Sequence, residues 1–232
     1  MKRFRRLKRL SLWETSVSDA GLIYLLDLPQ LKSIDLNDSR VHGHGLKHLN
    51  GLSNLTWLSL DGSPVTDARL AGLKDLSRLR VLILDHTQVS DAGLVHLKKL
   101  KELRILNLSH THVTGVGLAQ LKHLPELYWL RLNASPISDA GMTHLESLSV
   151  LSRLDLSGTN VSNAGLVHLC ELKNLEHLEL ERTQISDAGL VPLHGHPHLK
   201  DIDLDHTKVT MAGISELEAT LPASVVLIDE NE

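Results

Sequence analysis

One unit of 24 residues recurs nine times along this chain, with no insertion between the copies. The unit reads L-x-x-L-x-L-x-x-[TS]-x-[VI]-[ST]-D-A-G-L-x-x-L-x-x-L-x-x, and positions below are counted from its first leucine. A fixed period of this length predicts stacked coils, each of which buries its apolar side only against its neighbours. The copies start at Leu7, Leu31, Leu55, Leu79, Leu103, Leu127, Leu151, Leu175 and Leu199.

Composition narrows the classes of protein that fit this period. The unbroken repeat predicts a single domain over all 232 residues, with a core made mostly of leucine because only 3% of residues are aromatic. The net charge of −4 gives no reason to expect nucleic acid or an anionic membrane as a partner. No apolar run approaches the ~20 residues of a membrane span. The single cysteine, Cys170, excludes an intrachain disulfide and favours a reducing compartment, so we expect a cytoplasmic protein.

Each unit divides into a strand and a short helix. Leucines at positions 4 and 6 alternate with variable residues, which predicts a strand with one buried face: Leu82 and Leu84 point inward, whereas Val81, Ile83 and Asp85 point outward. Apolar residues at positions 16, 19 and 22 have the spacing of a buried helical stripe.

Small and polar residues between these segments predict how the chain turns. Ser or Thr at position 9 is expected to satisfy backbone groups inside the bend after the strand. Ser or Thr at position 12 predicts a helix N-cap, and Asp at position 13 a favourable charge at the helix start. Gly at position 15 predicts close backbone approach, and Arg69, which replaces it in the third coil, predicts a displaced or looser helix there.

With these features in place, the unit resembles the leucine-rich-repeat family, with Thr or Ser where Asn or Cys is more usual at position 9. The T-D-A-G-L continuation is similar to repeats of planctomycete-type bacterial proteins and of F-box and ribonuclease-inhibitor-like proteins. The resemblance covers residues 7–228. It implies an α/β solenoid curved like a horseshoe, with a parallel sheet on the concave face and short helices on the convex face. It implies no single activity.

The two ends depart from the unit. Only six residues precede the first coil, so its strand is expected to form a nearly bare edge on which Lys8 and Arg9 discourage strand addition. A basic arm for nucleic acid and a fragment of a longer protein are alternative readings of this end. We expect a monomer, or a weak homo-oligomer formed through this edge. Residues 221–232 are expected to form a short cap and an acidic tail, with a tenth strand at Val225 to Ile228.

The outward strand positions are where a partner of the concave face would bind. Position 3 is apolar in the four middle coils, with Ile83 and Tyr128 beside it, and exposed apolar surface with aromatic anchors is typical of protein interfaces. The alternative is that bulky residues simply cover the sheet. The candidate residues of this stripe are Trp57, Val81, Ile105 and Trp129.

Acidic residues occupy positions 5 and 7 of the last three coils. Like charges on adjacent strands repel, so this group either destabilises the sheet locally or contacts a basic partner. Arg131 and Arg153 are near enough in sequence to neutralise part of it, and Asp at position 5 is also common in the family. The candidates are Asp155, Glu179, Glu181, Asp203 and Asp205.

The sequence offers little catalytic chemistry. It has no glycine-rich phosphate loop and no G-x-S-x-G motif. Asp85, His86, His110 and His112 could supply zinc ligands, but a flat ladder of side chains does not usually converge as zinc requires. We therefore predict no metal, no cofactor and no enzyme.

The function predicted from sequence is a non-enzymatic scaffold that binds a protein, possibly one with a basic patch, on its concave face. The alternative is a substrate-recognition subunit of a ubiquitin-ligase-like or effector complex, and a metal-dependent enzyme is the third reading.

Overall fold

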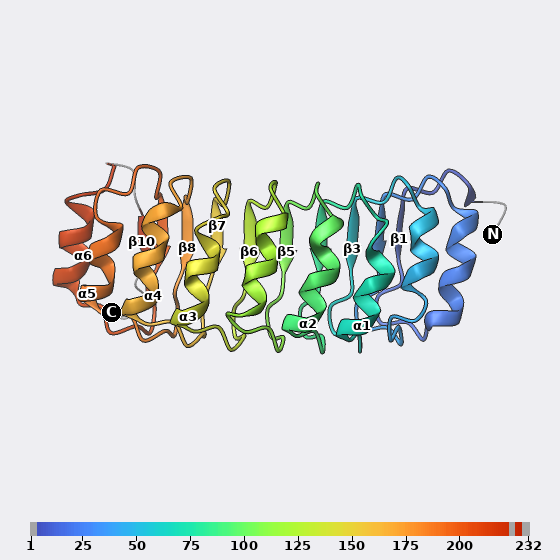
Figure 1. Ribbon diagram of the computed structural model, residues 1–232, viewed down its shortest axis with the longest axis horizontal. Coiled ribbons are helices and arrows are strands. Elements are labelled where there is room, and N and C mark those ends of the chain that lie inside the picture. The colour runs from blue at the N-terminus through green and yellow to red at the C-terminus, as the bar shows by residue number, and fades with distance from the viewer. Residues whose placement is uncertain (1–3, 223–225, 229–232) are drawn as a thin grey trace.

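The computed structural model describes residues 4–222 and 226–228. In these residues ten short parallel strands follow one another across a single open sheet in sequence order (Figure 1). From β1 to β9 each residue pairs with the residue 24 positions further on, as Trp57 does with Val81, so the repeat is itself the register of the sheet. The strands are β1 (Arg9–Ser11), β2 (Ser33–Asp35), β3 (Trp57–Ser59), β4 (Val81–Ile83), β5 (Ile105–Asn107), β6 (Trp129–Arg131), β7 (Arg153–Asp155), β8 (His177–Glu179), β9 (Asp201–Asp203) and β10 (Val226–Ile228).

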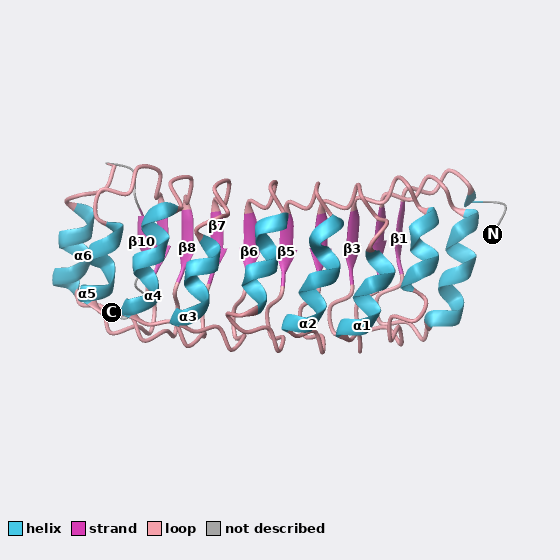
Figure 2. Ribbon diagram, viewed as in Figure 1, coloured by secondary structure: helices cyan, strands magenta, loops and turns pink. Residues whose placement is uncertain are grey.

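Helices cover one face of this sheet and leave the other open (Figure 2). The molecule is an α/β horseshoe-type solenoid whose open strand face is the concave face, as the sequence predicted. Most coils form a short α-helical turn followed by a 3-10 turn. The α-helices are α1 (Asp67–Leu70), α2 (Asp91–Leu94), α3 (Asp139–Met142), α4 (Asn163–Leu166), α5 (Asp187–Leu190) and α6 (Met211–Glu218). The 3-10 helices are η2 (Asp19–Asp27), η3 (Leu46–Gly51), η4 (Ala71–Leu73), η5 (Val95–Lys99), η6 (Gly117–His123), η7 (Thr143–Leu145), η8 (Val167–Glu171) and η9 (Val191–Leu193). None of the helices in the described ranges has the length and apolar character that crossing a bilayer requires.

The core runs between the two layers as one continuous column of leucine, valine and isoleucine. In the fourth coil Leu82 and Leu84 are fully buried, whereas Val81 and Ile83 on the opposite side of the strand stay partly accessible. The period-2 prediction for the strand is therefore confirmed. Each interior coil is covered on both sides by its neighbours, which is why the column has no break.

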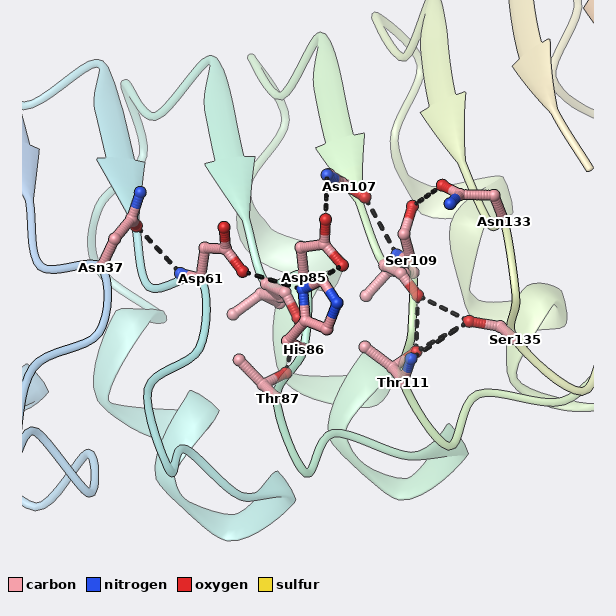
Figure 3. A network of polar contacts seen from close by, with 12 residues as sticks. Asn37, Asp61, Asp85, His86, Thr87, Asn107, Ser109, Thr111, Asn133 and Ser135 are labelled. Carbon is pink, nitrogen blue, oxygen red and sulfur yellow. Dashed lines mark hydrogen bonds and ion pairs between the residues drawn. The ribbon is translucent and has the colours of Figure 1, made fainter. Parts of the chain in front are cut away.

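The hydroxyls at position 9 form the predicted ladder inside the bend. Thr87 Oγ1 donates to the Leu84 carbonyl at 2.6 Å, and the other threonines of this column bond to their own coils in the same way (Figure 3). Ser135, which lacks the methyl group of threonine, donates its hydroxyl instead to the carbonyl of Leu108 in the preceding coil at 2.8 Å. The column thus satisfies buried carbonyls that the bend leaves outside the sheet ladder.

Position 12 does not cap the helices in the way the sequence predicted. In the described part of the chain Ser162 and Thr210 accept a bond from a helix N–H. The main partner of this position is instead the acid at position 13 of the preceding coil. Asp139 accepts the Ser162 backbone N–H at 2.7 Å and the Ser162 hydroxyl at 2.6 Å. Asp67, Asp91 and Asp187 repeat this pair of bonds with Ser90, Thr114 and Thr210. We call this contact the inter-coil staple.

The staple explains the glycine at position 15. A Cβ added to Gly165 would lie 2.6 Å from Asp139 Oδ1, so a side chain there would displace the stapling acid. Close backbone approach was predicted, and its cause is the acid of the coil before.

Arg69 was expected to disturb its own coil, and this prediction is wrong. The helix α1 forms in the third coil as it does elsewhere. The structural adjustment lies instead in the second coil, where Gly43 stands in place of the stapling acid and has φ 97°. The Arg69 side chain fills the space that the side chain of an acid would need there. This coil forms the 3-10 helix η3 and no α-helical turn.

The ends show how much each coil depends on its neighbours. Leu7, Leu10 and Leu12 of the first coil are only partly buried, and with Phe4 and Tyr24 they line an apolar hollow of about 450 Å³. At the other end β10 pairs with β9. Lys2, Arg3, residues 223–225 and the predicted acidic tail at 229–232 lie outside the described residues.

Candidate functional site

The four apolar residues predicted at position 3 form one unbroken row on the open strand face. Trp57 pairs with Val81, Val81 with Ile105, and Ile105 with Trp129 across β3 to β6. All four side chains are partly accessible. Neighbouring strands lie about 4.8 Å apart, so the row is about 15 Å long with an indole at each end. We call these four residues the apolar row.

Ile83 and Tyr128 extend the row to the two sides. Ile83 is partly accessible at position 5 of β4, where the same position holds the buried polar residues Ser59 and Asn107 on the neighbouring strands. Tyr128 precedes β6 and is 37% exposed. The strand register therefore places the four residues of the apolar row side by side, with Ile83 on the same strand as Val81 and Tyr128 next to Trp129 in the chain.

Arginines lie over the C-terminal end of the apolar row. The guanidinium carbon of Arg153 is 5.4 Å from the centre of the Trp129 ring, and that of Arg131 is 5.9 Å away. Such contacts stabilise by about 0.5–1 kcal/mol at exposed sites. Arg153 also bonds to His177 Nε2 at 3.4 Å, and His177 Nδ1 lies 3.3 Å from Asp201. Because arginine only donates, Nδ1 of the neutral ring carries the proton that Asp201 accepts.

This chain from Trp129 to Asp201 was not predicted. The sequence showed Arg153 only as a possible neutraliser of the acidic residues, and it gave His177 and Asp201 no role. The available signal was that all four occupy position 3 of successive coils, and the register places them side by side.

Three of the five predicted acids form a second row at position 5. Asp155 pairs with Glu179, and Glu179 with Asp203, across β7 to β9. Asp155 is 2% exposed and its Oδ2 accepts from Arg131 Nε at 3.4 Å. Burial, together with the charge and hydrogen bond of Asp155, raises the pKa of Glu179 to about 7. Burial also raises the pKa of Asp203.

The other two acids lie beside this row at position 7. Glu181 forms an ion pair with Arg182, and the Asp205 backbone N–H donates to Asp203 Oδ1 at 2.9 Å. We call the five residues the acidic strands. Repulsion was the predicted cost of this arrangement, and after burial the charge of Asp155 is the next largest cause of the raised pKa of Glu179.

A shallow hollow joins the two halves of the predicted site. It has a volume of about 180 Å³ and is lined by Trp129, Arg153, His177, Glu179 and Asp203, among others. An indole face and carboxylates thus meet in one depression, which suits a cationic side chain with an aliphatic stem.

The histidine group weighed in the sequence is also partly assembled. Ligand atoms of Asp85, His86 and His110 lie within 4.8 Å of one another, at the rim where the strands end. His112 is placed apart from them, on a backbone bridge with Ser90. No metal site was predicted from the sequence, yet the donor atoms of this cluster could hold a metal ion.

Comparisons with known proteins agree with this fold. A family model described as "Leucine Rich repeat" matches residues 99–121 and 171–193. Internalin C2 of Listeria monocytogenes is similar in structure, with a TM-score of 0.66, 21% identity, and coverage of 95% of this chain and 80% of that one. A leucine-rich-repeat protein of Leptospira interrogans has a TM-score of 0.66 and 19% identity, over 98% of this chain and 62% of that one. No curated protein sequence is significantly similar. At these identities the likeness concerns the fold.

Proposed function

Because this chain is a leucine-rich-repeat protein, we propose that it is a non-enzymatic scaffold that binds a protein partner on its concave strand face. The leucine-rich-repeat fold is commonly a protein-interaction scaffold. The strand face is the large surface that the helices leave uncovered, and its residues differ from coil to coil while the core does not.

The apolar row is the observation that carries the proposal. Binding energy at protein interfaces concentrates in a few aromatic anchors that sit in a patch surrounded by polar residues. Trp57 and Trp129 stand at the ends of such a patch, and Tyr128 is exposed beside it. The cost of leaving these side chains in water supports a partner that covers them.

The acidic strands support a partner with a basic surface. Arg131 and Arg182 pair with Asp155 and Glu181, yet burial and the charges of Asp155 and Asp203 still raise the pKa of Glu179 to about 7. A lysine or arginine of a partner placed in the hollow beside Trp129 would relieve this repulsion, and it would stack on the indole as Arg153 does.

The proposal also includes a cytoplasmic location and the absence of a catalytic cysteine. Cys170 donates to the Val167 carbonyl at 3.0 Å, and burial raises the pKa of its thiol, which supports a structural thiol in a reducing cytoplasm rather than a nucleophile. Neither the geometry nor the comparisons favour the substrate-recognition alternative over a plain scaffold.

Site-specific crosslinking tests the proposal. A photoreactive residue in place of Ile105, in the middle of the apolar row, should capture a defined protein in cells. The same residue in place of Val116, which is 75% exposed and precedes η6 on the helix side, should not.

The captured partner then allows the anchors to be tested. The double substitution Trp57→Ala and Trp129→Ala should weaken its binding by about 2–4 kcal/mol and leave the far-ultraviolet spectrum unchanged. Trp13→Ala is the matched control, because Trp13 is 56% exposed and lies outside the row. Equal binding by the double variant and the wild type would exclude the row as the interface.

A further inference from the structure

We propose that Asp85, His86 and His110 bind one transition-metal ion of the zinc class at the rim of the strand face. The ligand atoms of these residues already lie within 4.8 Å of one another. Ligands about 2.0–2.1 Å from a tetrahedral zinc ion are about 3.4 Å apart, so the ligand atoms need to approach by at most about 1.4 Å, and the two stacked rings must turn so that their in-plane lone pairs converge on the ion.

The two histidines lie side by side because of the repeat. Both occupy position 8, where the backbone is left-handed, and both have φ 52°. Their rings stack with centroids 4.2 Å apart and planes at 9°. The left-handed conformation explains why a histidine is tolerated at this position, since His is enriched there. It does not explain two of them in adjacent coils, beside a carboxylate from the strand end.

The carboxylate is oriented before any ion arrives. Asn107 Nδ2 donates to Asp85 Oδ2 at 3.4 Å, which turns Oδ1 toward the histidines. Within the described residues Asp85 Oδ1 is buried and has no hydrogen-bond partner of good geometry, although His86 Nδ1 lies 3.1 Å from it. A buried oxygen in this state is what a metal ion would satisfy.

A second carboxylate lies within reach of the same nitrogen. His86 Nδ1 is also 3.2 Å from Asp61 Oδ1, so the ring nitrogen stands between two acids (Figure 3). An ion that replaced the proton of Nδ1 would face one nitrogen and two carboxylate oxygens there, with His110 adjacent. The side chain of His86 is 55% exposed, which leaves the ring free to turn and the ion free to enter.

The donor set selects the class of ion. Imidazole with carboxylate suits zinc and its neighbours, whereas magnesium and calcium prefer oxygen alone. Two histidines and one carboxylate leave a fourth position open. In the isolated chain that position would hold water or the carboxylate of Asp61, which lies 3.2 Å from His86 Nδ1.

Titration of the whole, chelator-treated protein with zinc chloride tests the site. We expect one equivalent of Zn²⁺ to bind more tightly than the remaining histidines bind it. His86→Gln, His110→Gln and Asp85→Asn should each weaken this equivalent at least tenfold. His206→Gln is the matched control, because His206 also occupies position 8 with φ 56° and is exposed, yet lies outside the cluster. Cobalt(II) adds a second readout, because a tetrahedral site gives a visible absorption band that should persist in the His206 variant and disappear in the other three.

Two outcomes would overturn the proposal. Equal weakening by His206→Gln would show that the ion binds exposed histidines without selection, and unchanged affinity in the cluster variants would show that the ion lies elsewhere. Because all variants are measured on the isolated chain, either outcome leaves the proposed partner surface untouched.

Discussion

The helix starts and the strand face of this solenoid are built from the same coils, but their residues vary in different ways. At the helix starts the acid of position 13 recurs from coil to coil and bonds to the next coil, as Asp139 does to Ser162. On the strand face position 3 changes along the sheet, from tryptophan in β3 to arginine in β7 and aspartate in β9. Residues that fasten one coil to the next are constrained by an identical neighbour, whereas residues that face outward are not.

Some helix starts lack the acid at position 13 that bonds to the next coil. At two interior junctions glycine replaces the acid, as Gly43 before Arg69 and as Gly115 before Gly141. In both of these coils, within the described residues, the helix is 3-10 with no α-helical turn, as it also is in the first coil, which keeps Asp19 but has no preceding coil. The comparison predicts that substitutions at the helix starts change stability and those on the strand face change binding.

The largest effect is expected where a side chain is forced into an occupied junction. Gly43→Asp should destabilise the protein by about 3 kcal/mol, because the new Cβ overlaps Arg69 and the backbone there has φ 97°. Urea unfolding measures this. The second substitution Arg69→Gly should restore most of the loss, since it creates the acid–glycine pair of the other junctions. Failure of this rescue would contradict the proposed complementarity of positions 13 and 15.

Removal of a staple should have the next largest effect. Asp139→Ala leaves the Ser162 N–H and hydroxyl without their acceptor and should cost about 2 kcal/mol. Asp139→Asn should cost much less. The chain already uses this amide at the next junction, where Asn163 accepts from the Ser186 N–H at 2.9 Å and donates to its hydroxyl at 2.8 Å. Equal losses for the alanine and asparagine variants would show that the charge, rather than the paired bonds, holds the coils together.

A buried histidine should give a smaller effect with a defined pH dependence. His196 is 4% exposed at position 22, where the seven earlier coils have leucine. Burial lowers the pKa of His196 below its ordinary value. As the pH falls below about 6.5, the unfolded chain therefore takes up a proton on this histidine more readily than the native state does. The free energy of unfolding accordingly decreases on acidification. His196→Leu should add about 1 kcal/mol at pH 5.5 and less at pH 8, measured by urea unfolding at both values. An equal gain at both pH values would contradict this assignment.

The smallest effect on stability is expected on the strand face, with the opposite sign. The pKa of Glu179 is raised to about 7 in the native state, so the native state takes up a proton as the pH falls through 7 and gains stability. Glu179→Gln should raise the melting temperature more at pH 8 than at pH 5.5, because the penalty is relieved as the pH falls from 7 toward 4.5. The effect stays below about 1 kcal/mol because solvent screens this half-exposed group. Glu181→Gln, which removes a neighbouring acid that is paired with Arg182, is the matched control. A basic partner should bind the wild type more tightly at pH 8 than at pH 6.

Much of the fold could be predicted because it follows from local periodicity. Leucines at positions 4 and 6 fix which side of each strand is buried, and Thr87 bonds to a carbonyl of its own bend, three residues away. The candidate apolar residues were predicted for the same reason, since an uninterrupted period sets the register. The chain from Arg153 through His177 to Asp201 was missed because its members have unlike chemistry, and similarity between coils was the only signal used.

The sequence by itself determined the stacking of coils, the buried columns and the side of the sheet that faces outward, because these depend on residues within one unit and on its exact repetition. The tertiary structure decided which atoms the polar residues of each turn contact. The residue type at position 13 predicts a helix start, yet Asp139 bonds to a residue 23 positions away. Arg69 is likewise accommodated by Gly43 in the coil before it. The nine residues at position 8, from Glu14 to His206, include acidic, basic and small side chains, yet all have a left-handed backbone with φ from 49° to 65°. These outcomes are set by the neighbouring coil, whose distance and orientation exist only after the coils have packed.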